Sequence, residues 1–368
     1  MKFTQPFTLK SGVTLNNRIL MAPMTISASQ PNGDVTEEEL AYYHRRAKSG
    51  IGAVITACAY INSLGVGFPD SLGVESDERI PSLKRLADAI HSGGAKAILQ
   101  IFHAGRMTNS QLLGEQPVSA SDVPALRPNA EIPRPLTEEE VKATIQDFAD
   151  ATRRAIEAGF DGVELHGANT YLLQQFVSPH SNRRTDKWGG NAAERIAFPL
   201  AVVDAVKETV AKYAKKPFAI GYRFSPEEKE EPGITIDDTI LLIDALADKG
   251  IDYLHVSVNR FDAESMRDDK DSRGRVAVIQ EAIGERIPVI GVGGLQTVDQ
   301  VEAALDIVPL VSLGHALIMD PEWYEKAVNQ KEDEIFTALH LSKEQELDIP
   351  KPLWELIMNV PGWFTVEE

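Results

Sequence analysis

The sequence contains one cysteine, Cys58, among 368 residues. A single thiol excludes an intrachain disulfide and an iron–sulfur cluster, and it makes a cysteine-based metal site untenable. No apolar run approaches the length of about 18 residues that a membrane-spanning helix needs. The N-terminal stretch MKFTQPFTLKSG also has no apolar core of the kind found in signal peptides. These absences predict a protein that resides in a reducing cytoplasm.

Basic residues are scarce as well. The chain has 37 Lys and Arg against 55 Asp and Glu, a formal net charge of -18. This balance repels nucleic-acid phosphates and anionic membrane surfaces, so we expect neither as a partner. Hydrophobic residues make up 43% and charged residues 25%, which is typical of a globular protein with a large core.

Short β-rich runs alternate with longer helical patterns, as parallel βα units do. The runs are RILMAPM (18–24), GAVITAC (52–58), AKAILQIF (95–102), DGVELH (161–166), PFAIGYRF (217–224), IDYLHVSV (251–258), IPVIGVGG (287–294) and PLVSLG (309–314). One helical pattern begins with Thr137 and Glu140, the spacing of a capping box. The alternation predicts the α/β class and a closed (β/α)8 TIM barrel; a doubly wound open sheet is the alternative.

The barrel would occupy residues 1–330. Residues 103–136 follow the third strand and are too long for an ordinary connection, which predicts a lid insertion over the mouth of the barrel. Residues 331–368 form a C-terminal extension that contains the apolar stretch PLWELIMNVPGWF. We expect this extension to pack on the barrel or on a partner subunit, so a homo-oligomer is one of two expectations.

Polar residues and glycines stand at the ends of most predicted strands, where such barrels carry their active sites. The candidates are Pro23, Met24, Thr25, Cys58, Gln100, His103, His166, Asn169, Tyr171, Arg223, Gly293, Gly294, Gly314 and His315. The glycines after strands seven and eight would let backbone N–H groups approach a phosphate closely. The same glycines also suit tight turns with no ligand at all.

Several of these stretches together resemble a known family. NRILMAPMT, LQIFHAGR, HGANTYLLQQFVSPHSNRRTDKWGG and VGG with LGHALIMDP occur in the order found in the old yellow enzymes, which are FMN-dependent ene-reductases. The resemblance covers about residues 3–328. It implies a barrel with noncovalent FMN at its mouth, NADH or NADPH as reductant, and ping-pong hydride transfer from flavin N5 to activated C=C bonds of enals, enones and nitroalkenes.

The resemblance also implies roles for the residues that bind the cofactor. Gln100 and Arg223 would contact the pyrimidine edge of the flavin, and a hydroxyl on Thr25 would donate to its O4. Cys58 would serve the ring through its backbone N–H, with its thiol only packed. Further cofactor contacts would come from Pro23, Met24, His166, Gly293, Gly294, Gly314 and His315.

Three residues of the central motif would act on the substrate. By the resemblance, His166 and Asn169 would donate hydrogen bonds to one substrate oxygen and so draw charge from the conjugated double bond. Tyr171 would supply the proton that the α-carbon needs. We expect the following SNRRTDKWGG segment to hold the loop, and His103 and Arg106 to face the lid or bind loop backbone.

Two departures from the family pattern stand out. The family usually has Gly-Arg at the end of the eighth strand, where the arginine pairs with the FMN phosphate, and this chain has Gly314-His315. A basic residue after strand six could compensate; the candidates are Arg260, Arg267, Lys270, Arg273 and Arg275. Ser27 stands where some relatives have an aromatic residue, which predicts a more open pocket.

Two other functions fit part of the pattern. A barrel lyase or isomerase would use the same glycines for a phosphorylated substrate, without flavin redox chemistry. A flavin-binding protein without catalytic activity would keep the cofactor contacts alone.

Overall fold

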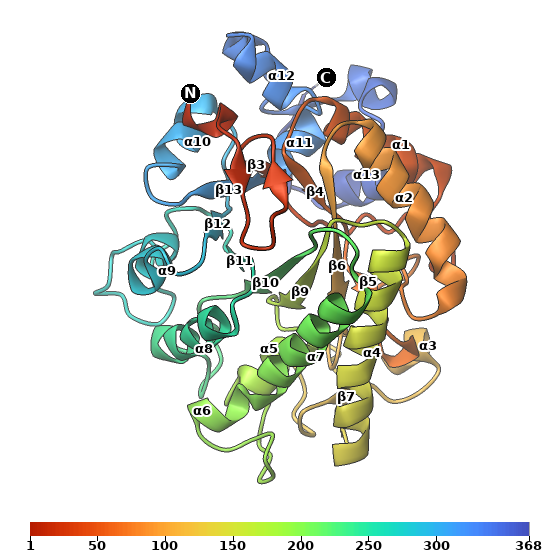
Figure 1. Cartoon of the computed structure of the whole chain (residues 1–368), viewed down its shortest axis with the longest axis vertical. Coiled ribbons are helices and arrows are strands. Elements are labelled where there is room, and N and C mark those ends of the chain that lie inside the picture. Colours follow the sequence, from red (N-terminus) through yellow and green to blue (C-terminus); the bar gives the residue numbers. More distant parts are fainter. Residues whose placement is uncertain (368) are drawn as a thin grey trace.

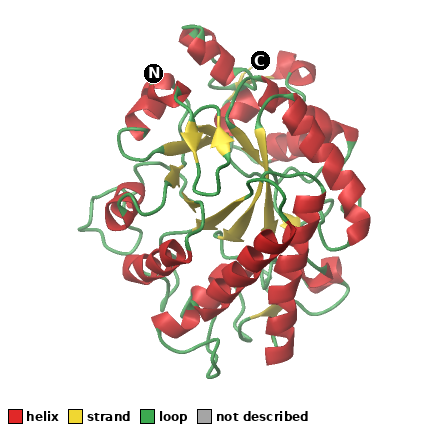
Figure 2. Ribbon diagram, viewed as in Figure 1, coloured by secondary structure: helices red, strands yellow, loops and turns green. Residues whose placement is uncertain are grey.

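The computed structural model of the chain describes residues 1–367 and has a ring of parallel strands inside a layer of helices (Figures 1 and 2). The barrel strands are β3 (Ile19–Met21), β4 (Ala53–Ile55), β6 (Lys96–Phe102), β9 (Gly162–Gly167), β10 (Ala219–Phe224), β11 (Tyr253–Val256), β12 (Val289–Gly291) and β13 (Leu310–Leu313). Because β6 pairs with both β9 and β4, the sheet closes on itself. The predicted (β/α)8 TIM barrel is confirmed, with each strand inside its predicted run or within one residue of it.

The helices that follow the strands form the outer layer (Figure 2). They are α1 (Glu37–Lys48), α2 (Ile80–Ser92), α4 (Glu138–Glu157), α7 (Ala197–Tyr213), α8 (Ile236–Lys249), α9 (Arg275–Ile283), α10 (Val298–Ala304) and α11 (His315–Met319). Thr137 and Glu140 form the predicted capping box at the start of α4. Within residues 1–367, no helix combines the length and the hydrophobicity needed to cross a bilayer.

Every second residue of the barrel strands points inward, and these residues form layers. At the amino end of the strands, the inward side chains are apolar, and the hairpin of β1 (Phe7–Thr8) and β2 (Thr14–Leu15) closes that end with Leu9 and Leu15. One step further along, Gln100 of β6 lies opposite Glu164 of β9 in the strand register. The interior therefore changes from apolar to polar toward the carboxyl ends of the strands.

The segment 103–136 contains α3 (Ser110–Leu113) and a short parallel pair of β7 (Val118–Ser119) and β8 (Arg134–Pro135). Shorter elements complete the connections: β5 (Ala59–Tyr60), α5 (Leu172–Val177), α6 (Ala192–Arg195), α12 (Trp323–Val328), and 3-10 turns at Lys2–Thr4, Ser63–Gly65 and Asp77–Arg79.

The C-terminal extension lies against α1 of the barrel. It contains β14 (Leu339–His340), α13 (Lys351–Asn359), β15 (Val366–Glu367), and 3-10 turns at Glu332–Glu334 and Leu341–Glu346. The buried guanidinium of Arg46 in α1 donates to the carbonyl of Leu347 (3.1 Å), and the N–H of Lys351 donates to Glu38 (3.1 Å). β15 pairs with β14, which holds the end of the chain in place.

The absence of a side chain at Gly221 lets an aromatic ring cross the barrel. A Cβ atom at Gly221 would lie 2.0 Å from Cζ of Tyr253, whose hydroxyl donates to Glu164 (3.0 Å). We predict that Gly221→Ala lowers the free energy of unfolding by about 1–3 kcal/mol, because the buried ring has no space into which it can move. Urea unfolding measures this loss. An unfolding free energy equal to that of the natural chain would contradict the packing described.

Candidate active site

A cavity of about 470 Å³ opens at the carboxyl ends of the barrel strands. Seven of the predicted site residues line it: Pro23, Met24, Arg223, Gly293, Gly294, Gly314 and His315. The lining also includes residues that sequence reasoning missed, among them Asn259, Gln296 and Trp363. Trp363 comes from the C-terminal extension, whose apolar sequence was the only signal that it packs on the barrel.

Two glycines give this cavity a wall without side chains. Gly293 has φ +122° and Gly294 has φ +64°, conformations that residues with a Cβ rarely adopt. A Cβ at Gly293 would also lie 2.6 Å from the carbonyl carbon of Arg260. The glycines thus make a tight turn and at the same time leave backbone exposed to the cavity.

Arg223 brings a positive charge to the lining of the same cavity. Its side chain is buried, and Nη1 makes a long hydrogen bond of 3.4 Å to the carbonyl of Pro23. Its Nε has no hydrogen-bond partner among the described residues. A buried guanidinium with an unused donor is costly unless a ligand completes its hydrogen bonds.

A buried carboxylate orients several of the neighbouring groups. Glu164 accepts hydrogen bonds from Nε2 of Gln100 (2.8 Å), from the hydroxyl of Tyr253 (3.0 Å) and from Nδ1 of His255 (2.9 Å). Nε2 of His255 in turn lies 2.8 Å from the hydroxyl of Ser312. Burial lowers the pKa of His255, so it is neutral and donates from Nδ1 while it accepts at Nε2.

Sequence reasoning predicted Gln100 but missed Glu164, Tyr253, His255 and Ser312. All four stand at positions of the predicted strands that share a face with other inward residues. The period-two pattern of the strands was the signal that could have found them.

His166 and Tyr171 form an aromatic group beside this network. Their ring centroids are 4.8 Å apart, and Phe102 packs on Tyr171 at 5.1 Å. Burial, and secondly the charge of Arg223, lower the pKa of His166 to about 3. The N–H of Ala168 points to Nδ1 of His166 at 3.4 Å, which leaves Nε2 as the protonated nitrogen. His166 is therefore a neutral hydrogen-bond donor.

Thr25 and Cys58 lie at the edge of the same aromatic group. The Thr25 hydroxyl is 3.9 Å from the Cys58 sulfur, and Cys58 packs with Phe102 and Tyr171. Burial raises the pKa of Cys58 to about 12, so the thiol stays protonated. Burial also raises the pKa of Tyr171, which keeps its hydroxyl proton available.

Asn169 is held in a left-handed conformation with φ +53°. Its N–H donates to the hydroxyl of Ser225 (3.0 Å), and its side-chain oxygen accepts from the hydroxyl of Ser257 (2.9 Å). The side chain is exposed, and its NH₂ group is the part left to donate to a ligand. Neither serine was predicted, because each follows a different strand from Asn169.

The remaining motif residues bind backbone. Arg106 donates to the carbonyls of Val123 and Pro124, both at 2.9 Å, and its Nη2 lies 3.2 Å from Nδ1 of His180. Asn182 donates to the carbonyls of Phe176 (2.7 Å) and Trp188 (2.8 Å). Arg106 thus fastens segment 103–136 to the loop after β9.

His315 is packed against the C-terminal extension. Its ring centroid lies 4.2 Å from that of Phe364 and 5.9 Å from that of Trp363. Partial burial lowers its pKa, so it is neutral at pH 7. His315 therefore lines the cavity as a neutral ring, without the fixed charge of an arginine.

The cavity fits FMN in three respects. Its glycine wall leaves room for close approach of a phosphate, Arg223 has an unused buried donor, and the volume is of the size that ligand pockets have. Gln100 and Arg223 would hold the ring, and Gly293, Gly294 and Gly314 would hold the phosphate chain.

Comparisons with known proteins agree with this fit. Residues 2–334 match the family described as NADH:flavin oxidoreductase / NADH oxidase. Over 361 residues the chain is 46% identical to the probable NADH-dependent flavin oxidoreductase YqiG of Bacillus subtilis (strain 168), covering 98% of this chain and 96% of that protein. The NADH:acrylate oxidoreductase of Vibrio harveyi is 47% identical over 353 residues, which are 95% of this chain but 35% of that protein.

A similar solved structure is the old yellow enzyme homologue from Zymomonas mobilis. Its TM-score is 0.78 at 26% identity, and the match covers 90% of this chain and 93% of that one.

We predict that His166 stays neutral, with its proton on Nε2, as the pH falls from about 8 to about 5. An unperturbed histidine, with a pKa of about 6.5, becomes charged within this range. Because the folded-state pKa is about 3, the unfolded chain binds the proton first as the pH falls. His166 therefore lowers stability progressively between about pH 6.5 and about pH 3. Ring ¹⁵N chemical shifts measure this, with His166→Gln to assign the signal. A shift that titrates near neutral pH would contradict the assignment.

Proposed function

Because the chain belongs to the NADH:flavin oxidoreductase / NADH oxidase family, we propose that it reduces activated C=C bonds of small molecules such as enals, enones and nitroalkenes. The predicted likeness to old yellow enzymes, the FMN cofactor and the nicotinamide-dependent oxidoreductase activity are confirmed by the family match and the relatives. This family match favours redox chemistry over the alternative of a lyase or isomerase.

One observation carries the proposal. The uncharged donors His166 and Tyr171 pack on each other, and Asn169 stands two residues before Tyr171. These three residues are outside the lining of the cavity that fits FMN, to which Arg223 belongs. Arg223 of β10 is paired in register with His166 of β9, so the cofactor wall and the donor set meet on neighbouring strands. A flavin-binding protein without catalytic activity would not need hydrogen-bond donors at these positions.

FMN, when bound, supplies a hydride acceptor for the nicotinamide and a hydride donor for the alkene. Around it, Arg223 would donate to the pyrimidine edge, Gln100 would donate to it or accept from it, and Thr25 would donate to O4. Glu164 would keep the amide of Gln100 turned in one direction through the 2.8 Å hydrogen bond. The backbone of Pro23, Met24 and Cys58 would complete the contact with the ring.

His166 and Asn169 would hold the substrate. Each has a neutral N–H donor, and two donors on one carbonyl or nitro oxygen polarise the conjugated C=C bond. Neutrality matters because an imidazolium beside Arg223 would add a second buried positive charge. Tyr171 would deliver its hydroxyl proton to the α-carbon as hydride reaches the β-carbon.

The two additions to the barrel would shape access to this site. We propose that segment 103–136 is a lid, fastened by Arg106, and that the C-terminal extension closes the phosphate end of the cavity through Trp363. The NADH:acrylate oxidoreductase is much longer than this chain, so its substrate supports the class of reaction and not acrylate itself. The cytoplasm as location also belongs to the proposal. The extension packs on the barrel of its own chain, the first of the two expectations, so a homo-oligomer is not part of it.

The experiment that tests the cofactor and the reductant is direct. Heat release and chromatography of the purified protein are expected to give FMN at about one per chain. Anaerobic titration with NADH and with NADPH is then expected to bleach the flavin. A protein that stays colourless after reconstitution with FMN would refute the proposed function.

We predict that Tyr171→Phe separates the two half-reactions. Reduction of the flavin by the nicotinamide needs no proton on carbon, so its rate is expected to stay close to that of the natural protein. Reduction of an enone needs one, so its rate is expected to fall by ~10²–10⁴, the contribution of one general acid. Stopped-flow absorbance measures both rates. Equal slowing of both would show that Tyr171 only supports the fold.

We predict that Asn169→Asp slows enone reduction by ~10²–10³, because a carboxylate cannot donate to the substrate oxygen as the amide does. Ser257→Ala is the matched control, since it removes the 2.9 Å bond that orients Asn169 and leaves the donor in place. Its effect is expected to be much smaller. Comparable losses in the two variants would mean that Asn169 acts through its loop and not through the substrate.

A further inference from the structure

The phosphate end of the cavity needs a positive charge that its own lining does not supply. A phosphate monoester carries a charge of about -1.5 to -2 near neutral pH. The ionisable residues in the lining are Arg223 and His315. Arg223 lies beside His166, and its charge also acts on Glu164, while His315 is neutral. Another basic residue close to Gly293 and Gly294 would therefore strengthen FMN binding.

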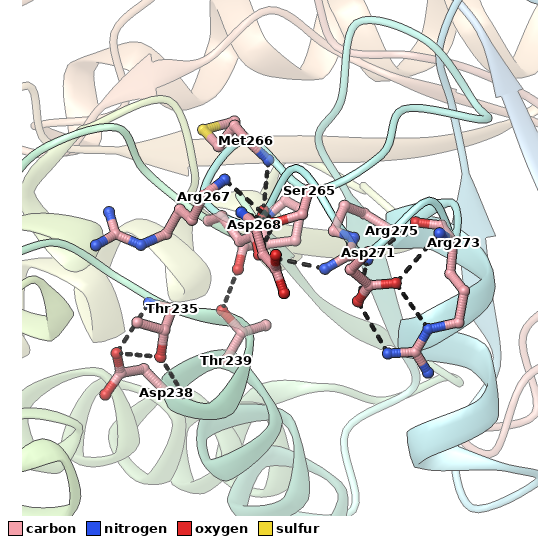
Figure 3. A network of polar contacts seen from close by, with 12 residues as sticks. Thr235, Asp238, Thr239, Ser265, Met266, Arg267, Asp268, Asp271, Arg273 and Arg275 are labelled. Atoms are coloured by element: carbon pink, nitrogen blue, oxygen red, sulfur yellow. Dashed lines mark hydrogen bonds and ion pairs between the residues drawn. The ribbon is translucent and has the colours of Figure 1, made fainter.

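Two of the basic residues after β11, Arg267 and Arg275, are each held by several other partners. Arg267 donates to the carbonyls of Glu228 (2.6 Å) and Glu230 (2.8 Å) and pairs with Glu231. Figure 3 shows Asp271 between Arg273 and Arg275, which both bind it, and Arg275 also pairs with Glu227 at 3.2 Å.

Arg260 differs from these residues in position. The N–H of its neighbour Phe261 donates to the carbonyl of Gly293 (2.9 Å), so this part of the loop is fastened to the glycine turn. Arg260 lines a second cavity of about 390 Å³, which shares Gly293, Gly294 and Leu295 with the cofactor cavity. Lys270 and Arg273 are in the lining of neither cavity.

The side chain of Arg260 is held only weakly. It makes two hydrogen bonds to Asp262, at 3.0 and 2.9 Å, but both side chains are more than 70% exposed. Exposed ion pairs of this kind contribute about 0–1 kcal/mol. A phosphate offers the same bidentate geometry with more charge, so it competes well for the guanidinium.

We propose that Arg260 supplies the positive charge for the FMN phosphate in this protein, in place of a residue at position 315. The proposal rests on the FMN assignment made above. In the bound state Arg260 leaves Asp262 and reaches across the Gly293–Gly294 turn to the phosphate oxygens.

Riboflavin, which has the same ring without the phosphate, is the probe that isolates this contact. The purified chain is loaded with FMN or, by exchange, with riboflavin, and the dissociation constants are taken from flavin fluorescence on dilution. Arg260→Ala is expected to raise the dissociation constant of FMN about tenfold and to leave that of riboflavin unchanged. The difference is expected to shrink at high salt because the contact is exposed.

Arg273→Ala is the matched control, because Arg273 is also an exposed arginine paired with an aspartate two residues away. It is expected to change neither dissociation constant. Asp262→Ala removes the partner of Arg260. It is expected to lower the dissociation constant of FMN and to leave that of riboflavin unchanged.

Two results would overturn the proposal while the cofactor assignment stands: FMN binding unchanged by Arg260→Ala, or equal weakening of FMN and riboflavin. A protein that binds neither flavin would instead refute the proposed function and this inference together.

Discussion

The rest of the site depends on one constraint, which is that the carboxylate of Glu164 is buried and needs hydrogen bonds from its neighbours. A charge taken out of water costs several kcal/mol unless hydrogen bonds and opposite charges replace its hydration. Burial alone would raise the pKa of Glu164, but His255, Arg223 and Gln100 act against burial and lower it. Because this one carboxylate accepts hydrogen bonds from Gln100, Tyr253 and His255 at once, the barrel core fixes the orientation of these three side chains.

This arrangement explains why the interior is layered. The apolar layer and the N-terminal hairpin exclude water from beneath Glu164, and Gly221 leaves space for Tyr253 to reach it. Above it lie Arg223, which carries charge, and His166, which burial keeps neutral. The site thus places a charged side chain and a neutral hydrogen-bond donor on adjacent strands.

The fold and part of the candidate site could be predicted from the sequence because both follow local patterns. Alternation of short β-runs and helices indicated the closed barrel, and position at the predicted strand ends indicated seven residues of one cavity. Contacts between distant segments could not be predicted in this way. Ser257 on Asn169 and Trp363 in the cavity join elements that only the three-dimensional closure of the barrel brings together. The roles of His166, Asn169 and Tyr171 remain predictions.

The central claim is that one flavin-binding cavity passes electrons from a nicotinamide nucleotide to an activated alkene. A single-turnover experiment without oxygen tests it most directly. The protein is reduced with one equivalent of NADH or NADPH, and a simple cyclic enone is then added. The account predicts that the oxidised flavin spectrum returns and that one saturated ketone forms per flavin. A flavin that stays reduced with every enone, enal and nitroalkene, and is oxidised only when air is admitted, would contradict it.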